Sequence, residues 1–132
     1  MMDPIRILIG ISVRGSAMDS MEELKLKQRE FANKRDWEQF HSPKNLAMAL
    51  SVEVAEIVEI LQWLTEEQSQ SLTDEQRLAM QDEIGDVMNY LVRLADRLDI
   101  EPVQAAMQKT EKNRIKYPVE SAKGSSTKYP EL

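Results

Sequence analysis

The chain has 132 residues, of which 42% are hydrophobic and 30% charged, and its net charge is −6. These values are typical of one globular domain with a modest core, and the negative charge disfavours nonspecific binding to nucleic acid. The absence of cysteine excludes disulfides and thiolate metal sites and fits the cytoplasm, which we expect as the location, and a single histidine argues against a histidine-based zinc site. No apolar run reaches the ~18 residues that span a bilayer, so no membrane partner is expected.

Residues 1–19 differ in pattern from the rest and are interpreted as an N-terminal extension. Apolar residues alternate here as they do in a strand, at Ile5, Ile7, Ile9, Ile11 and Val13. A short strand, a disordered arm and a cloning-derived extension all fit this pattern. A signal peptide fits less well, because the start is not strongly basic and the cleavage context is poor.

Four helices are predicted in the body of the chain. In chain order they cover residues 20–35, 43–64, 74–99 and 102–116, with a connector at 36–42 and a polar loop at 65–72. Ser20 and Thr73 are each followed three residues later by Glu or Gln, which is the capping-box pattern of a helix start. Pro43 and Pro102 suit the first turns of the second and fourth helices.

This pattern predicts an all-α fold of the four-helix-bundle type, with the domain over residues 20–118. We see no internal repeat and no convincing strand in that range. Residues 119–132 are polar and contain Gly, Ser and Pro, so they are expected to form a flexible C-terminal tail.

Two acidic pairs lie on helical segments whose other residues are predicted to be buried. The pairs are Glu53 with Glu56 and Glu83 with Asp86. Each pair is spaced i,i+3, so its two carboxylates share one helix face. Four carboxylates among apolar residues are costly unless a cation compensates their charge. Oxygen ligands that converge from two helices suit Mg²⁺ or Mn²⁺, so the two pairs predict a metal site.

Spacing alone does not decide this, because about four such pairs are expected by chance in a chain this acidic, and a solvated face or capping acids also explain a pair. The context favours a site. The first pair shares a helical stripe with Trp63 and the second with Tyr90, a mixture that solvated faces seldom show. Gly85, inside the second pair, costs ~1 kcal/mol relative to alanine in a helix, which indicates close packing against another helix.

Aromatic and basic residues are further candidates for a binding site. The aromatic candidates are Trp37, Phe40, Trp63 and Tyr90. Such rings stack on nucleobases, but they also fill cores and subunit interfaces. His41 suits a donor to a base or phosphate, or a cap for the helix that follows it. Lys109 and Asn113 share a helix face with Lys116. They suit phosphate oxygens, while the lysines alternatively offset the negative end of the helix dipole.

The order of these residues resembles the MazG-like all-α nucleoside triphosphate pyrophosphohydrolases. The resemblance starts from Glu53-Val-Ala-Glu56, followed after 26 residues by Glu83-Ile-Gly-Asp86. Further segments are similar to the dCTP pyrophosphatase-like branch, namely residues 31–41, 43–46, 62–63, 90–92 and 109–118. The likeness covers about residues 21–118.

The resemblance implies catalytic carboxylates that hold Mg²⁺, or alternatively Mn²⁺: Glu53, Glu56, Glu83 and Asp86. It implies a substrate site with a base pocket of Trp37, His41, Trp63 and Tyr90 and phosphate contacts from Lys109 and Asn113. It also implies a homotetramer, a dimer of two tight dimers, with sites near subunit boundaries.

Two departures stand beside the resemblance. Val52 precedes the first acidic pair where the broader motif has a second glutamate, as expected for the dCTPase-like branch. Gln28 stands nine residues before Trp37, where the animal branch has a base-contacting histidine, so the base preference stays open.

The expected function is hydrolysis of a nucleoside triphosphate to the monophosphate and pyrophosphate. The first candidate substrate is dCTP or a related deoxynucleotide, and the expected role is clearance of the nucleotide pool. Glu56 or Glu59 could orient or deprotonate the attacking water. The alternative is a non-enzymatic helical adaptor whose apolar faces serve oligomerisation. That reading explains the apolar helices, but it does not explain acids aligned with Trp63 and Tyr90.

Overall fold

A computed structural model describes residues 20–128 and divides the chain into two compact units, residues 1–99 and residues 100–132. Every regular element within residues 20–128 is a helix, so the predicted all-α class is confirmed for them. The predicted domain over 20–118 spans both units. The predicted strand pattern in residues 5–13 lies outside the described residues.

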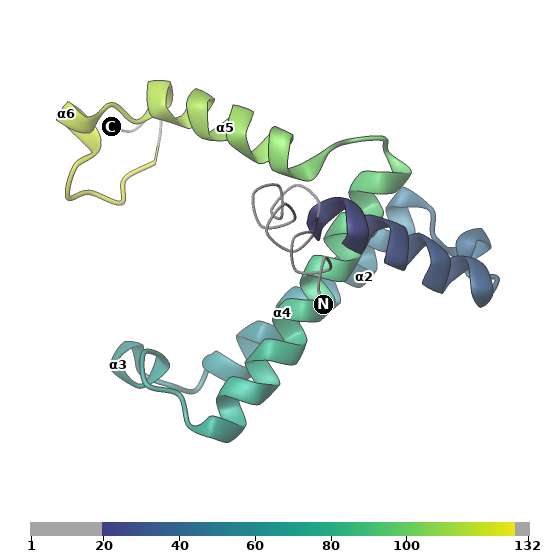
Figure 1. The fold of residues 1–132 in the computed structure, drawn as a ribbon. Helices are drawn as coiled ribbons and strands as arrows, with labels where there is room; N and C mark the ends of the chain where they lie inside the picture. The colour runs from purple at the N-terminus through teal and green to yellow at the C-terminus, as the bar shows by residue number, and fades with distance from the viewer. Residues whose placement is uncertain (1–19, 129–132) are drawn as a thin grey trace, which may run out of the picture. The chain divides into compact units, whose positions relative to one another are not determined.

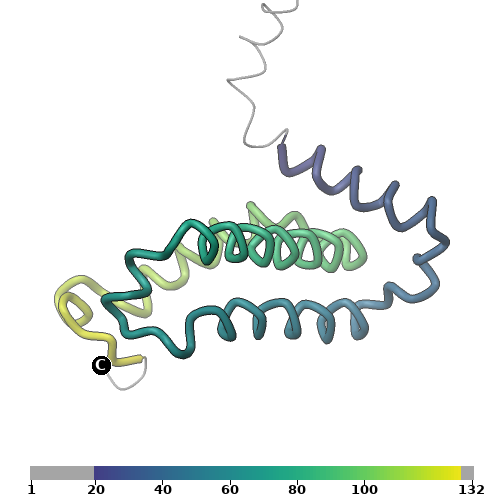
Figure 2. The backbone as a smooth tube through the Cα atoms, turned by 90° about the horizontal axis from the view of Figure 1, so that it is seen from below, coloured from purple at the N-terminus to yellow at the C-terminus, as the bar shows by residue number. Residues whose placement is uncertain are grey.

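Over residues 20–99, the first unit has five helical segments in chain order. They are a helix over residues 20–34, the 3₁₀ helix η1 (Glu38–Phe40), α2 (Pro43–Leu61), α3 (Glu66–Ser69) and α4 (Asp74–Arg97) (Figure 1). Among the labelled helices, α2 and α4 form the main packed pair. They run side by side in opposite directions, and the turn that carries α3 joins them at one end (Figure 2). Acidic residues on the facing sides of α2 and α4 are therefore brought together.

The starts of α2 and α4 follow the prediction, because both depend on local capping. Ser42 is extended, with φ −67° and ψ 155°, and its Oγ accepts a hydrogen bond from the backbone N of Asn45. Thr73 and Gln76 form the predicted capping box at the start of α4. Pre-proline geometry and side-chain caps are read from three or four consecutive residues, which is why the sequence places these starts correctly.

Three predicted features were wrong. Ser20 is already helical and so is not the cap of the first helix, and α2 ends at Leu61 rather than near residue 64. The predicted loop at 65–72 contains α3. A second capping box between Thr65 and Gln68 starts this short helix, because the Thr65 hydroxyl accepts from the backbone N of Gln68.

The apolar core of the first unit is small. Its fully covered apolar residues lie where the first helix, the start of α2 and the second half of α4 meet: Ala32, Leu46, Val92 and Ala95. Many large apolar residues of α2 and α4 stay exposed in the single chain, including Met48, Val52, Val54, Val58, Leu78, Ile84, Met88 and Leu91. A single chain therefore leaves much of the apolar surface of its central helix pair uncovered.

The second unit contains α5 (Pro102–Lys116) and the short α6 (Val119–Ala122). The helix α5 has the predicted bounds, and the Glu101 carboxylate caps it by accepting from the backbone N of Val103 and Gln104. The predicted C-terminal tail, residues 119–132, begins with α6, and its flexibility stays a prediction. Within residues 20–128, no helix is both long and apolar enough to cross a bilayer.

Candidate active site

Three of the four predicted carboxylates converge between α2 and α4. One carboxylate oxygen from each of Glu53, Glu56 and Glu83 lies within 4.8 Å of the other two, close enough to share one metal ion. Two of these residues come from one turn of α2 and the third comes from the facing turn of α4. The i,i+3 spacing and the side-by-side helices together create this cluster.

Two oxygens in this cluster are buried without a donor. Neither Glu53 Oε2 nor Glu83 Oε2 has a hydrogen-bond partner among the described residues. A carboxylate oxygen removed from water is costly when nothing compensates it. A hard cation satisfies several such oxygens at once, so this donor set fits Mg²⁺ or Mn²⁺ by its chemistry.

Crowding also changes the acidity of the cluster. A hydrogen bond with Glu56, followed by desolvation and by repulsion from Glu56 and Asp86, raises the pKa of Glu83 to about 7. Desolvation is the main cause of the raised pKa of Glu53, and repulsion from Glu56 and Asp86 adds to it. Glu83 therefore retains a proton up to about pH 7, which lowers the repulsion within the cluster.

Asp86 connects the carboxylate cluster to a neighbouring pocket. It stands outside the three-carboxylate group, but its charge raises the pKa of both Glu53 and Glu83. It also lines a cavity of about 180 Å³, together with Gln28, Phe31, Trp37, His41, Asn89, Tyr90 and Arg93. The cavity therefore begins where the carboxylates end, and most of its wall is aromatic or polar.

The backbone places Trp37 at this cavity. The first helix ends with Asp36 in the left-handed region at φ 55°, and the backbone N of Trp37 donates to the carbonyl of Ala32 at 2.9 Å. The N of Asp36 donates to Asn33, which completes a Schellman-type C-cap. The Trp37 ring then packs edge-on against Phe31, with centroids 5.7 Å apart.

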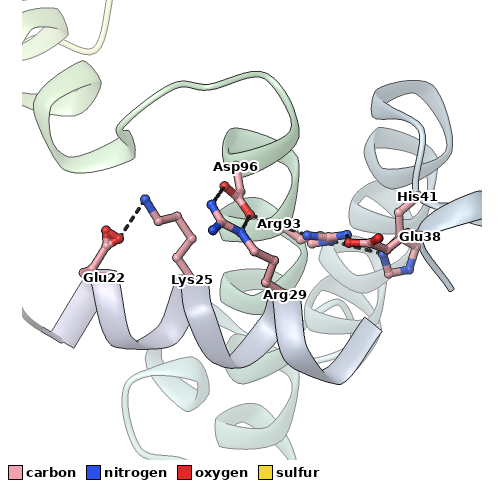
Figure 3. Close-up of polar contacts among 7 residues, drawn as sticks. All are labelled: Glu22, Lys25, Arg29, Glu38, His41, Arg93 and Asp96. Carbon is pink, nitrogen blue, oxygen red and sulfur yellow. Dashed lines mark hydrogen bonds and ion pairs between the residues drawn. The ribbon is translucent and has the colours of Figure 1, made fainter. Parts of the chain in front are cut away.

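His41 lies at the same wall and is held from α4. Its ring is 6.3 Å from that of Trp37, and its Nδ1 accepts a hydrogen bond from Arg93 Nε at 3.2 Å. The Arg93 guanidinium also contacts Glu38 and Asp96, each at 3.5 Å (Figure 3). The predicted alternative, that His41 caps α2, was wrong, because Ser42 performs that role.

The other predicted site residues lie elsewhere. Trp63 follows the end of α2, is 84% exposed and does not line the cavity. Phe40 is also exposed in the single chain and lies outside the lining. Lys109 and Asn113 belong to α5 in the second unit.

Sequence reasoning gave no role to Asn89 or Arg93, although both line the cavity. The signal for Arg93 was its position, since it follows Tyr90 by three residues and Asp86 by seven on the same helical stripe. The Arg29–Asp96 pair that lies behind Arg93 gave no local signal, because its partners are 67 residues apart.

Comparison with known proteins agrees with this geometry. Residues 48–132 match the MazG-like family model. "dCTP pyrophosphatase 1" of Mus musculus is 43% identical over 121 residues, covering 90% of this chain and 71% of the relative. The Homo sapiens protein of the same name is also 43% identical, over 115 residues, covering 86% of this chain and 68% of the relative.

A crystal structure of a pyrophosphatase from Archaeoglobus fulgidus has a similar fold. Its TM-score is 0.71 at 42% sequence identity, and the match covers 75% of this chain and 93% of that one. The carboxylate cluster, the aromatic cavity beside it and these matches lead to one conclusion, that the chain belongs to the MazG-like family.

Proposed function

We propose that this protein hydrolyses deoxynucleoside triphosphates to the monophosphate and pyrophosphate. The observation that carries the proposal is the pair of buried, donorless oxygens on Glu53 and Glu83, next to an aromatic cavity that Asp86 joins to them. Relatives named dCTP pyrophosphatase 1, at 41–43% identity, make dCTP the first candidate substrate. Clearance of unwanted nucleotides is the proposed purpose.

Mg²⁺ is the proposed cofactor, with Mn²⁺ as the alternative. Glu53, Glu56 and Glu83 would hold it, and Asp86 would complete the set on the cavity side. When bound, the ion would supply positive charge that offsets the negative charge developing on the phosphates in the transition state. Glu56 or Glu59 would orient the attacking water and accept its proton as the bond between the α- and β-phosphates breaks.

The cavity is the proposed base and sugar site. The Trp37 ring offers a stacking surface for the base, and His41 offers a polar edge at the same wall. Tyr90 is one helical turn after Asp86, so its ring suits the sugar of a nucleotide whose phosphates lie at the carboxylates. An added 2′-hydroxyl would clash there or lack a partner, which favours deoxyribose. Lys109 and Asn113 remain proposed phosphate contacts, on the family resemblance.

A complete site needs a second copy of the chain. His41 precedes α2 and Trp63 follows it, and 19 helical residues span about 28 Å. One chain therefore cannot place both rings on one nucleobase. The exposed apolar residues of α2 and α4 offer the surface for association. We propose a homotetramer, a dimer of dimers, in which Trp63 reaches the cavity of a neighbouring copy. The cytoplasm is the proposed compartment, on the cysteine-free sequence.

Incubation with Mg²⁺ and a panel of ribo- and deoxynucleoside triphosphates tests the activity. We expect pyrophosphate release, fastest with a deoxynucleotide and dependent on the metal. Asp86→Asn should abolish turnover and reduce the rise in melting temperature that Mg²⁺ produces by binding the native state. Asp82→Asn is the matched control, since Asp82 is an exposed acid on the same helix that belongs neither to the cluster nor to the cavity. Undiminished activity of Asp86→Asn would remove the metal assignment, and no release from any triphosphate would favour the adaptor alternative.

A further inference from the structure

A buried arginine lines the cavity, and ion pairing alone does not explain its position. Arg93 is only 3% exposed. Its contacts with Asp96 and Glu38 are both long, at 3.5 Å. Asp96 is already held by Arg29, which donates to both of its oxygens, at 2.7 and 3.0 Å (Figure 3). The shortest contact of the Arg93 guanidinium is instead the one to His41 Nδ1, at 3.2 Å.

This contact determines where the proton of His41 resides. A guanidinium carries only N–H donors, so the ring nitrogen that faces it must be an acceptor without a proton. In a neutral imidazole the single proton then lies on Nε2. No described residue makes a hydrogen bond to Nε2, which leaves that N–H for a molecule in the cavity that His41 lines.

The charges around His41 favour the same neutral form. Burial lowers the pKa of His41, and the positive charges of Arg93 and Arg97 on α4 lower it further, while Glu38 of η1 opposes them. Of the other polar groups at the cavity, Gln28 on the first helix is uncharged, and Asp86 lies about two turns before Arg93 on α4. A second proton on His41 would also point an N–H at the guanidinium and break the contact.

We propose that Arg93 is a positioning residue that fixes His41 in its Nε2–H tautomer, so that the cavity presents a donor to a hydrogen-bond acceptor on the ligand. Arg29 holds Asp96, which makes a long contact of 3.5 Å with the Arg93 guanidinium. The acceptor would belong to the nucleobase edge or to a phosphate oxygen, and in this respect the inference rests on the proposed function. A ligand with a donor at this point would be rejected, because two N–H groups would then face each other.

His41 is the only histidine in the chain, so its ring nitrogens can be observed without assignment in the complete protein labelled with ¹⁵N-histidine. At pH 7 and without ligand, we expect a protonated Nε2 and an unprotonated Nδ1. A proton on Nδ1, a mixture of tautomers or a doubly protonated ring in this wild-type protein would overturn the proposal. This measurement needs no variant and no activity.

Two variants separate the hydrogen bond from the charge. Arg93→Met should give a mixture of tautomers, raise the pKa of His41 and raise KM roughly tenfold, with little change in kcat, for one lost hydrogen bond to the ligand. Arg97→Gln removes a nearby charge that makes no hydrogen bond to His41, so its tautomer should stay unchanged. A wild-type tautomer in Arg93→Met would contradict the role of Arg93.

A third pair of variants applies if Arg93→Met does not fold. The amide of His41→Gln reaches the place of Nε2 and that of His41→Asn the place of Nδ1, so Gln should retain substrate affinity better than Asn. Equal loss in both would count against an Nε2 donor.

Two probes identify the acceptor. Deoxycytidine carries the base without phosphate, and pyrophosphate carries phosphate without the base. A shift of the Nε2 resonance with deoxycytidine places the acceptor on the base, and a shift with pyrophosphate places it on phosphate. A shift with neither refutes the donor role. If the protein releases no pyrophosphate from any triphosphate, the proposed function fails while the tautomer result still stands, so the two failures are distinguishable.

Discussion

The protonation of Glu83 depends strongly on the neighbouring carboxylates. Its pKa of about 7 lies above the ordinary value of 4.5, because its hydrogen bond with Glu56 and the surrounding negative charge favour the protonated form. Since the native state holds this proton more tightly than the unfolded chain, the contribution of Glu83 to stability is fully present below pH 4.5. It is lost as the pH rises through about 7.

We therefore expect the metal-free protein to lose stability between about pH 4.5 and pH 7. Thermal melts across this range should show the fall in the wild type and a flatter profile in Glu83→Gln, where no proton is lost. The pKa of Asp96, which its hydrogen bond with Arg29 lowers, gives the opposite trend at more acid pH. The lowered pKa of His41 also opposes the fall within this range, but it does so in both proteins, so the comparison with Glu83→Gln isolates the contribution of Glu83. Mg²⁺ should remove the fall by replacing the proton. A wild-type profile that parallels Glu83→Gln without metal would contradict the assignment.

Substitutions at the cavity should change substrate binding, whereas substitutions in the carboxylate cluster should change the rate of the chemical step. Trp37 lines the cavity and lies outside the carboxylate cluster, so Trp37→Ala should raise KM roughly tenfold while kcat changes little. Glu56 lies in the cluster, so Glu56→Gln should lower kcat by at least about 100-fold. Steady-state kinetics on the preferred deoxynucleotide measure both. An unchanged KM in Trp37→Ala would reject the stacking role.

At the scale of elements, no contact within the single chain explains why position 85 of α4 is a glycine. The sequence indicated close helix packing at Gly85, yet a Cβ built there meets no atom within 4 Å in the first unit. Leu78 and Met88 share its helix face and are exposed as well. A mid-helix glycine that no intrachain contact requires suggests a face that a second copy covers.

We expect Gly85→Ala to weaken assembly while it strengthens the isolated helix by up to ~1 kcal/mol. Sedimentation should show more dissociation at low concentration, and circular dichroism should show unchanged or increased helicity. A variant with unchanged assembly and higher stability would mean that no second copy approaches this face.

The elements also show what a sequence can and cannot predict. The start of α2 at Pro43, the start of α4 after Thr73 and both ends of α5 follow from local capping and from proline, so they were predictable. The three-carboxylate cluster was predictable in composition, because i,i+3 spacing defines a face. The contact of Arg93 with His41 joins residues 52 apart, and no local pattern encodes such a contact.

For the whole molecule, the balance of buried and exposed apolar surface determines the assembly. The described part of the first unit buries four apolar residues, while 14 of its large hydrophobic residues stay exposed. Soluble monomers rarely leave large apolar patches in water. We expect a dimer or a tetramer at micromolar concentration in analytical ultracentrifugation, and the family resemblance favours the tetramer. A monomer under those conditions would contradict both the assembly and the shared site.

The position of the carboxylate cluster has a mechanical consequence. Two of its members lie on α2 and one on α4, and the two helices run in opposite directions. Sliding one helix past the other by a single turn displaces its side chains by about 5.4 Å, which is enough to separate the three oxygens. The affinity of the cluster for a cation should therefore depend strongly on the register between the two helices. Substitutions far from the cluster that let the pair slip should weaken metal binding before they unfold the chain.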